Sequence, residues 1–183
     1  MKINIIGPSC VGKSTLAEVI AKKNNWNHFD LDLVFIDHDY LAQTKNFRYK
    51  SKIDRRKKIN EILISNKDWI IEGVYLVKEI LEQSDLIIFI NLPIIVPLKW
   101  QWKRYFTDIN QRNTYGLLNN LGLTKEIFNE YFQKYENKNL TNEMSFSMTK
   151  YKEIIKIYDN KSKVVSNIDD LKKLRLSGDY NKL

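Results

Sequence analysis

The sequence is poor in the residues and runs that mark secreted, membrane-spanning or zinc-binding proteins. Its one cysteine, Cys10, excludes an internal disulfide bond and is typical of a reducing compartment. No run approaches the roughly 18 consecutive apolar residues that a membrane span needs, and the apolar start of the chain is too short for a signal peptide. The two histidines, His28 and His38, lack partners at metal-ligand spacing, so no zinc site is expected. We therefore expect a cytoplasmic protein without a membrane partner.

Length and charge set further bounds. The chain has 183 residues, which suits one domain spanning residues 1–183 rather than two. Hydrophobic residues make up 43%, an ordinary share for a globular protein. Lys and Arg outnumber Asp and Glu by 30 to 22, and the resulting charge of +8 suits a polyanion such as a nucleotide or nucleic acid. A solvated, lysine-rich surface explains the same excess, so the charge alone does not choose a partner.

Short apolar runs alternate with segments of helical period along the chain. The runs predict strands at residues 2–6, 27–37, 68–73, 85–93 and 162–167. Helices are expected at residues 13–25, 51–66, 74–84, 94–106, 124–138, 145–160 and 168–176. Strands that alternate with helices predict a parallel sheet covered on both faces. The expected fold class is α/β, with three layers and a five-stranded parallel sheet in the middle one.

The segment 107–122 breaks this alternation. It is polar, holds Gly116 and Gly122 and lacks a clear period, so it predicts a loop or lid. Thr124 then follows as the expected cap of the next helix. No linker rich in proline, glycine or serine divides the chain. The simplest organisation is one α/β domain with a short helical or loop lid.

Residues 7–14, "GPSCVGKS", match the phosphate-loop pattern G-x-x-x-x-G-K-[ST] at every fixed position. A predicted strand precedes the pattern and a predicted helix follows it. Glycines let successive backbone N–H groups point at phosphate oxygens, and the helix adds its positive end. Lys13 is expected to reach the β- and γ-phosphates, and the Ser14 hydroxyl to ligate Mg²⁺. The expected nucleotide-binding residues of the loop are Gly7, Pro8, Ser9, Cys10, Val11, Gly12, Lys13, Ser14 and Thr15.

Other features narrow the class of phosphate-loop protein. A switch GTPase needs N-K-x-D after a strand, whereas the fourth and fifth predicted strands end "INLP" and "VVSN". A chain of 183 residues leaves little room for a motor or transporter scaffold. The pattern therefore favours a small kinase, in which catalysis depends on positioning and charge neutralisation.

Several motifs occur in the order seen in small P-loop kinases. "GPSCVGKSTLA" is followed by "FDLDLVFID", "WIIEGVY", "SDLIIFINLP" and the basic "WQWKRY". Over nearly its whole length the chain resembles adenylate, shikimate and gluconate kinases, and in particular the adenylate-kinase-like group labelled DNA topology modulation proteins. The resemblance implies a P-loop NTPase fold, a kinase activity, and the use of ATP and Mg²⁺.

The resemblance also implies roles for acidic residues at strand ends. Asp30 and Asp32 match the D-x-D of shikimate kinase-like enzymes, and Asp32 alone matches the topology modulation group. Both are expected to face the acceptor, with Asp32 accepting its hydroxyl proton and Asp30 lying beside Mg²⁺. Glu72 is expected to hold a Mg²⁺-bound water, and Gly73 to let the acceptor approach the backbone. Glu72 replaces the family's Asp and Val74 its Asn, which leaves the acceptor open; solvent-facing carboxylates are the structural alternative.

An acceptor-binding helical region is expected at about residues 33–67. Arg55 and Arg56 lie where the acceptor-binding helices of the resembled kinases carry an arginine. Adjacent helical positions point about 100° apart, so the sequence does not decide which of the two faces the acceptor.

A lid region is expected at about residues 104–122. Arg104 and Arg112 fall where the resembled kinases carry lid arginines, whose planar donors stabilise the charge of the transferring phosphate. They lie eight residues apart, so at least one of them is expected on a loop rather than on a shared helix face. Asn167, after the last predicted strand, corresponds to a position that contacts adenine through backbone groups in the resembled kinases. A solvated basic face is the alternative for each arginine.

Two functions remain after this reasoning. The first is an ATP- and Mg²⁺-dependent kinase whose acceptor is a nucleotide, a nucleoside or a small hydroxylated metabolite. The second is an ATP-binding protein that is not a kinase and associates with DNA, as the net charge of +8 and the group's label suggest. The sequence leaves the oligomeric state, and the choice between ATP and GTP, undecided.

Overall fold

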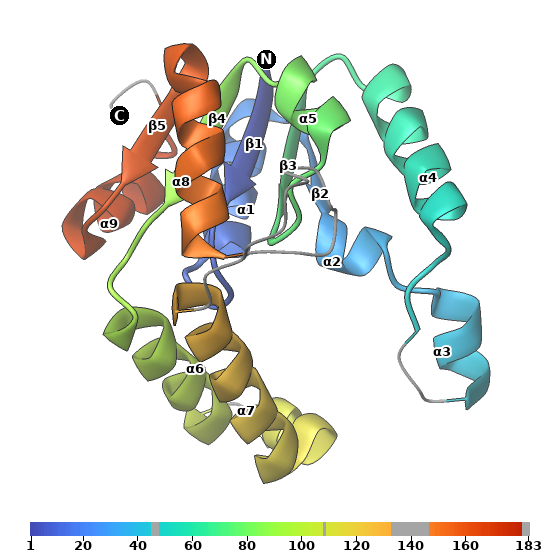
Figure 1. Cartoon of the computed structure of the whole chain (residues 1–183), viewed down its shortest axis with the longest axis vertical. Coiled ribbons are helices and arrows are strands. Elements are labelled where there is room, and N and C mark those ends of the chain that lie inside the picture. The colour runs from blue at the N-terminus through green and yellow to red at the C-terminus, as the bar shows by residue number, and fades with distance from the viewer. Residues whose placement is uncertain (45–47, 108, 133–146, 181–183) are drawn as a thin grey trace.

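The computed structural model describes residues 1–44, 48–107, 109–132 and 147–180, and a parallel sheet forms its centre (Figure 1). The described strands pair in the order β2-β3-β1-β4-β5, and every pair is parallel. Parallel neighbours need a crossover connection, and helices supply it here. The predicted α/β fold with a five-stranded parallel sheet is confirmed. The strands are β1 (Lys2–Ile6), β2 (Asn27–Asp30), β3 (Trp69–Gly73), β4 (Leu86–Ile90) and β5 (Ser162–Val165).

Helices cover both faces of the sheet and extend beyond one of its edges (Figure 1). Among the described helices, none combines the length and the apolar character that crossing a membrane requires. The helices are α1 (Lys13–Asn24), α2 (Leu31–Val34), α3 (His38–Thr44), α4 (Lys52–Ser65), α5 (Lys78–Gln83), α6 (Ile95–Thr107), α7 (Ile109–Phe132), α8 (Met148–Ile157) and α9 (Ile168–Ser177).

The two faces of the sheet bury different halves of the same strands, since successive side chains of a strand point to opposite sides. Ile3 and Ile5 of β1 join a core with the buried side chains of α1 and α9. Ile6 of β1 and Phe89 of β4 join a second core with α5 and α8. A third core, around Trp69 and Ile71 of β3, takes in α2, α4 and α5. Strands β3 and β4 are buried along their whole length because helices cover both of their faces, whereas the edge strands β2 and β5 are only partly buried.

The carboxyl ends of the strands define where a site can form. In Figure 1 the helices α2, α3, α6 and α7 lie beyond these ends, on the side where α1 begins. Ligands of open α/β sheets bind outside the carboxyl ends of the strands. The fold thus gathers the phosphate loop, the acidic strand ends and the α6–α7 pair at one edge.

The prediction of a loop over residues 107–122 is wrong. From Ile109 onward this segment is the first part of α7, and Thr124 lies inside that helix instead of capping it. Tertiary contacts with α6 explain the difference: the buried Gln101 donates from Nε2 to the Asn120 carbonyl oxygen at 2.6 Å and to Thr124 Oγ1 at 3.0 Å. A glycine inside a helix costs about 1 kcal/mol relative to alanine, and packing of this kind offsets that cost.

Other predicted boundaries also shift, and the second strand and the helix after the third strand change by several residues. The second strand, expected over 27–37, ends at Asp30, because the Asp30 carboxylate accepts hydrogen bonds from the backbone of Asp32 and Leu33 and starts α2. The helix expected over 74–84 begins only at Lys78. The preceding residues, 74–77, are buried between β3 and that helix.

Candidate active site

The phosphate loop joins β1 to α1, and its backbone conformation is unfavourable for residues that carry a side chain. Gly7 has a φ of 149°, and a Cβ there would lie 2.7 Å from the Ile90 carbonyl oxygen of β4. Gly12 has a φ of 86°, and Cys10 adopts a left-handed φ of 60° despite its side chain. The loop can therefore pass close to β4 and turn into α1 because its glycines lack a Cβ.

Lys13 is the first residue of α1 and is only 6% exposed. Its Nζ donates to the Pro8 carbonyl oxygen at 2.9 Å, so the ammonium group folds back over the loop. Ser14 and Thr15 follow in the first turn and are exposed. The first N–H groups of a helix have no partner within the helix and attract anions. This arrangement of a buried ammonium group and an open helix start can hold a phosphate group.

The predicted acidic residues meet across the ends of β2 and β3. Asp30 and Glu72 are paired in register, and Glu72 is 1% exposed. Asp32 Oδ1 and Glu72 Oε1 are buried and have no hydrogen-bond partner among the described residues. Asp32 Oδ1 lies 3.7 Å from where a Cβ on Gly73 would be. Asp30 differs, because its Oδ1 caps α2.

Burial and the repulsion between neighbouring carboxylates raise the pKa values of Asp30 and Asp32. Burial raises the pKa of Asp32 to about 6; the charge of Lys13 opposes this rise, and Asp30 and Glu72 add to it. The pKa of Asp30 is also raised, first by burial and then by Glu72. Strongly shifted carboxyl groups at the end of a sheet are typical of functional sites.

These residues fit a magnesium–nucleotide complex better than a free metal ion. Among the described residues, no group of three or more His, Cys, Asp or Glu side chains could hold a metal by itself. Mg²⁺ is usually held by one or two carboxylates, water and substrate phosphates. One carboxylate oxygen each of Asp32 and Glu72 is buried without a hydrogen bond within the described part of the chain, with His28 Nε2 at 3.8 Å from Glu72 Oε1, and together with the exposed Ser14 hydroxyl they form a set of ligands of that kind.

The structure separates the two arginines that the sequence could not. Arg55 is 8% exposed, and its guanidinium carbon lies 5.4 Å from the centre of the Phe35 ring. Arg56 is exposed on the outer side of α4. Burial raises the pKa of Tyr75, a hydrogen bond with Tyr49 and the charge of Asp32 add to the rise, and the charge of Arg55 opposes it. Arg55 is therefore the buried arginine of the two, packed against Phe35 within the fold, and Arg56 is the solvent-exposed one.

The structure describes the side chain of only one of the two predicted lid arginines, Arg104. Arg104 is exposed near the end of α6, and its charge lowers the pKa of the Cys10 thiol, which burial raises. Arg104 thus lies within electrostatic reach of the phosphate loop. Arg112 belongs to the backbone of α7, but its side chain is outside the part of the chain that the structure describes. The expectation that one of the two lies on a loop is wrong, because both lie on helices.

Asn167 has a structural role in the described geometry. Its Oδ1 accepts the backbone N–H of Asp170 at 2.8 Å and caps α9. The carbonyl oxygen of Asn167 accepts the backbone N–H of Leu171 at 3.3 Å in the first turn of α9. The contact with adenine through backbone groups stays a prediction.

Sequence reasoning missed two residues that touch the phosphate loop. Glu130 of α7 is 2% exposed and accepts two hydrogen bonds from Ser9. Arg175 of α9 donates from Nη2 to the Gly12 carbonyl oxygen at 3.1 Å, and its guanidinium carbon lies 5.2 Å from the centre of the Trp100 ring. Both lie more than 100 residues from their loop partner, so no local spacing could have revealed them.

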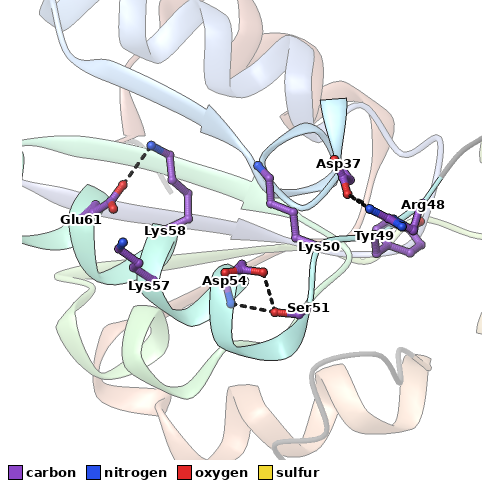
Figure 2. A pocket seen from close by; sticks show the side chains of 9 residues that line it. All are labelled: Asp37, Arg48, Tyr49, Lys50, Ser51, Asp54, Lys57, Lys58 and Glu61. Carbon is purple, nitrogen blue, oxygen red and sulfur yellow. Dashed lines mark hydrogen bonds and ion pairs between the residues drawn. The ribbon is translucent and has the colours of Figure 1, made fainter. Parts of the chain in front are cut away.

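An open pocket of about 610 Å³ lies in the predicted acceptor region, between α4 and residues 48–51 (Figure 2). Its charged walls are largely paired: Arg48 Nη2 lies 2.5 Å from Asp37 Oδ2, and Lys58 Nζ lies 3.0 Å from Glu61 Oε2. Arg55 and the phosphate loop do not contribute to its walls, so we treat it as separate from the candidate active site. The lining residues are Asp37, Arg48, Tyr49, Lys50, Ser51, Asp54, Lys57, Lys58 and Glu61.

Comparison with known proteins places the fold. No protein-family model matches the chain, and no curated protein sequence matches it. Among solved structures, a gluconokinase from Sinorhizobium meliloti 1021 is similar with a TM-score of 0.50 and 12% identity, covering 97% of this chain and 90% of that chain. A shikimate kinase from Acinetobacter baumannii, in complex with shikimate, gives a TM-score of 0.41 and 15% identity over 87% and 94%. The likeness to the gluconokinase shows that this chain has the fold of a small P-loop kinase.

Proposed function

We propose that this protein is an ATP- and Mg²⁺-dependent kinase that phosphorylates a small molecule. One observation carries the proposal: the buried lysine that begins the phosphate-loop helix acts electrostatically on a buried carboxyl group, one oxygen of which has no hydrogen-bond partner among the described residues. Lys13 and Asp32 come from different elements, and the charge of Lys13 lowers the pKa of Asp32. The shared fold of a gluconokinase supports the same kind of reaction.

The residues divide into a phosphate side and an acceptor side. On the phosphate side, the loop amides and Lys13 would hold the nucleotide, and Ser14 would hold Mg²⁺, with Asp30 or Glu72 reaching it through water. The metal supplies charge neutralisation between neighbouring phosphates. Arg104, whose charge acts on Cys10 of the loop, would stabilise the charge that develops on the transferred phosphate.

On the acceptor side, Asp32 would orient the acceptor hydroxyl and accept its proton. A general base works best with a pKa near the working pH, and burial raises the pKa of Asp32 to about 6. Gly73 ends β3 next to Asp32 and would let the acceptor approach the backbone, and Arg55, whose charge lowers the pKa of the nearby Tyr75, would bind the acceptor. A nucleotide, a nucleoside or a small hydroxylated metabolite each offers the hydroxyl or phosphate oxygen that this chemistry needs.

A coupled assay of ADP release tests the proposal. The purified protein with Mg²⁺ and ATP is offered nucleoside monophosphates, nucleosides, sugar acids and polyols in turn. Lys13→Ala is expected to lose acceptor-stimulated turnover, because the ammonium group no longer reaches the phosphates. Lys22→Ala is the matched control, since Lys22 is exposed in the last turn of the same helix.

The comparison between the two variants decides the result. Turnover on at least one acceptor in wild type and Lys22→Ala, and its loss in Lys13→Ala, is the expected outcome. If no acceptor raises the wild-type rate above that of Lys13→Ala, the kinase proposal is contradicted. Repeating the assay with GTP determines which nucleotide the site prefers.

A further inference from the structure

Glu130 is a buried carboxylate held against the phosphate loop from a distant helix. The Ser9 backbone N–H donates to Glu130 Oε2 at 2.8 Å, and the Ser9 hydroxyl donates to Glu130 Oε1 at 2.7 Å. The two residues are 121 positions apart in the sequence. In Figure 1 the C-terminal end of α7 lies beside the loop between β1 and α1. Burying a carboxylate is costly unless it is hydrogen-bonded, and both of its oxygens have a donor here.

The contact lies next to a strained turn of the loop. Ser9 immediately precedes Cys10, whose left-handed φ of 60° is unfavourable for a residue with a side chain. Glu130 binds both the main chain and the side chain of Ser9, so it fixes the peptide that leads into this turn. Hydrogen bonds to an ionised acceptor are stronger than neutral ones and can offset backbone strain of this kind.

The contact occupies one N–H group of the loop, that of Ser9, and leaves the donors at the start of α1 open. Glu130 meets Ser9, whereas the start of α1 comes later, at Gly12 and Lys13. The Lys13 ammonium group is held separately, by the Pro8 carbonyl oxygen. A carboxylate placed at Ser9 therefore supports the loop from the α7 side without taking the donors of the helix start.

We propose that Glu130 is a positioning residue of the phosphate loop. It holds Ser9, and through Ser9 the strained turn at Cys10, in the shape that receives a nucleotide phosphate. The nucleotide part of this inference rests on the proposed function; the support of the loop does not. It also links the α6–α7 pair to the loop, so that the helix carrying Arg104 and the phosphate site are held in one arrangement.

Cys10 provides a direct readout of the loop, since it is the one cysteine of the chain and is adjacent to Ser9. The rate of thiol labelling by 5,5′-dithiobis(2-nitrobenzoate) is measured as a function of pH for wild type, Glu130→Gln and Glu126→Gln. Both carboxylates raise the pKa of the Cys10 thiol, so either substitution shifts the pH midpoint. The plateau rate at high pH reports access to the thiol once the loss of one negative charge near the anionic reagent is accounted for, and Glu126→Gln measures that charge effect.

The expected plateau rate for Glu130→Gln is about tenfold above wild type, which is the effect of one lost charged hydrogen bond. Glu126→Gln, one turn earlier on α7 and exposed, is expected to keep the wild-type plateau. Ser9→Ala, which removes the hydroxyl donor, is the second variant and should move in the same direction as Glu130→Gln. Equal plateau rates in all four proteins would overturn the inference.

Calorimetry with Mg-ATP tests the link to nucleotide binding. Glu130→Gln is expected to weaken binding about fivefold to tenfold, and Glu126→Gln to leave it unchanged. Adding Cys10→Gly, which removes the strain of the left-handed turn, should shrink the effect of Glu130→Gln; the double-mutant cycle measures this coupling. A variant that only destabilised the fold would lose thermal stability equally in both backgrounds.

The outcomes separate the inference from the proposed function. Wild-type protein that takes up no Mg-ATP contradicts the kinase proposal, while the labelling rates still decide whether Glu130 holds the loop. Wild-type uptake with an unchanged dissociation constant in Glu130→Gln overturns the positioning role, even if labelling becomes faster. If Glu130→Gln binds Mg-ATP more weakly than wild type and Cys10→Gly partly restores that binding, the positioning role of Glu130 is supported.

Discussion

Replacing Asp32 with asparagine is expected to stabilise the folded protein at neutral pH while removing its kinase activity. Asparagine keeps the shape of the side chain but cannot ionise, so the buried charge near Glu72 and Asp30 disappears. Burial raises the pKa of Asp32 from 3.8 to about 6. A shift of about 2 units corresponds to about 3 kcal/mol at 1.36 kcal/mol per unit, which is an upper bound on the gain.

The sign of the effect follows from proton linkage. The folded state favours the neutral carboxyl group, so between pH 3.8 and about 6 it binds more protons than the unfolded state. The contribution of Asp32 to stability is therefore fully present below pH 3.8 and is lost as the pH rises to about 6. In Asp32→Asn this decrease in stability with rising pH no longer occurs, because asparagine does not ionise. The variant should match wild type at low pH and exceed it at neutral pH.

Urea denaturation followed by circular dichroism measures this difference. The free energy of unfolding is determined for wild type and Asp32→Asn at several pH values from 3.5 to 7.5. The difference is expected to grow with pH and to level off above about pH 6, together with loss of acceptor-stimulated ADP release. A difference that does not change with pH, or a variant that is less stable at neutral pH, would refute the reasoning.

Two further substitutions test the packing around the site. Gly7→Ala places a methyl group 2.7 Å from the Ile90 carbonyl oxygen. We therefore expect the free energy of unfolding to fall by about 2 kcal/mol or more and Mg-ATP binding to weaken. Wild-type values for both quantities would show that the loop can move away from β4. Gln101→Leu leaves the Asn120 carbonyl oxygen and the Thr124 hydroxyl without their partner in α6, so α7 amides should exchange hydrogen about tenfold faster; unchanged exchange would mean that other contacts hold α7.

Local patterns predicted what depends on neighbouring residues. The phosphate loop follows from eight consecutive positions, since glycine, lysine and serine must occupy fixed places around the phosphate. The central strands follow from runs such as Leu86–Ile90, because a strand buried on both faces must be apolar throughout. The five-stranded parallel sheet could be predicted for the same reason.

Other features needed contacts between distant parts of the chain. The α7 segment lacks a clear period of its own, and its helix is held by Gln101 of α6. The choice between Arg55 and Arg56 depends on where α4 packs against Phe35. Neither feature can be predicted from a pattern of residue types, because each arises from the packing of one element on another.

The sequence by itself thus determined the class of fold, the loop and the residue types that can bind a phosphate. The tertiary structure alone decided what surrounds the loop: Glu130 against Ser9, and Arg175 against Gly12. The physical reason is that a motif is a local constraint, with its residues held at fixed spacing along one chain segment. The support of that motif comes from side chains 121 and 163 positions away, which meet it only after the helices have packed onto the sheet.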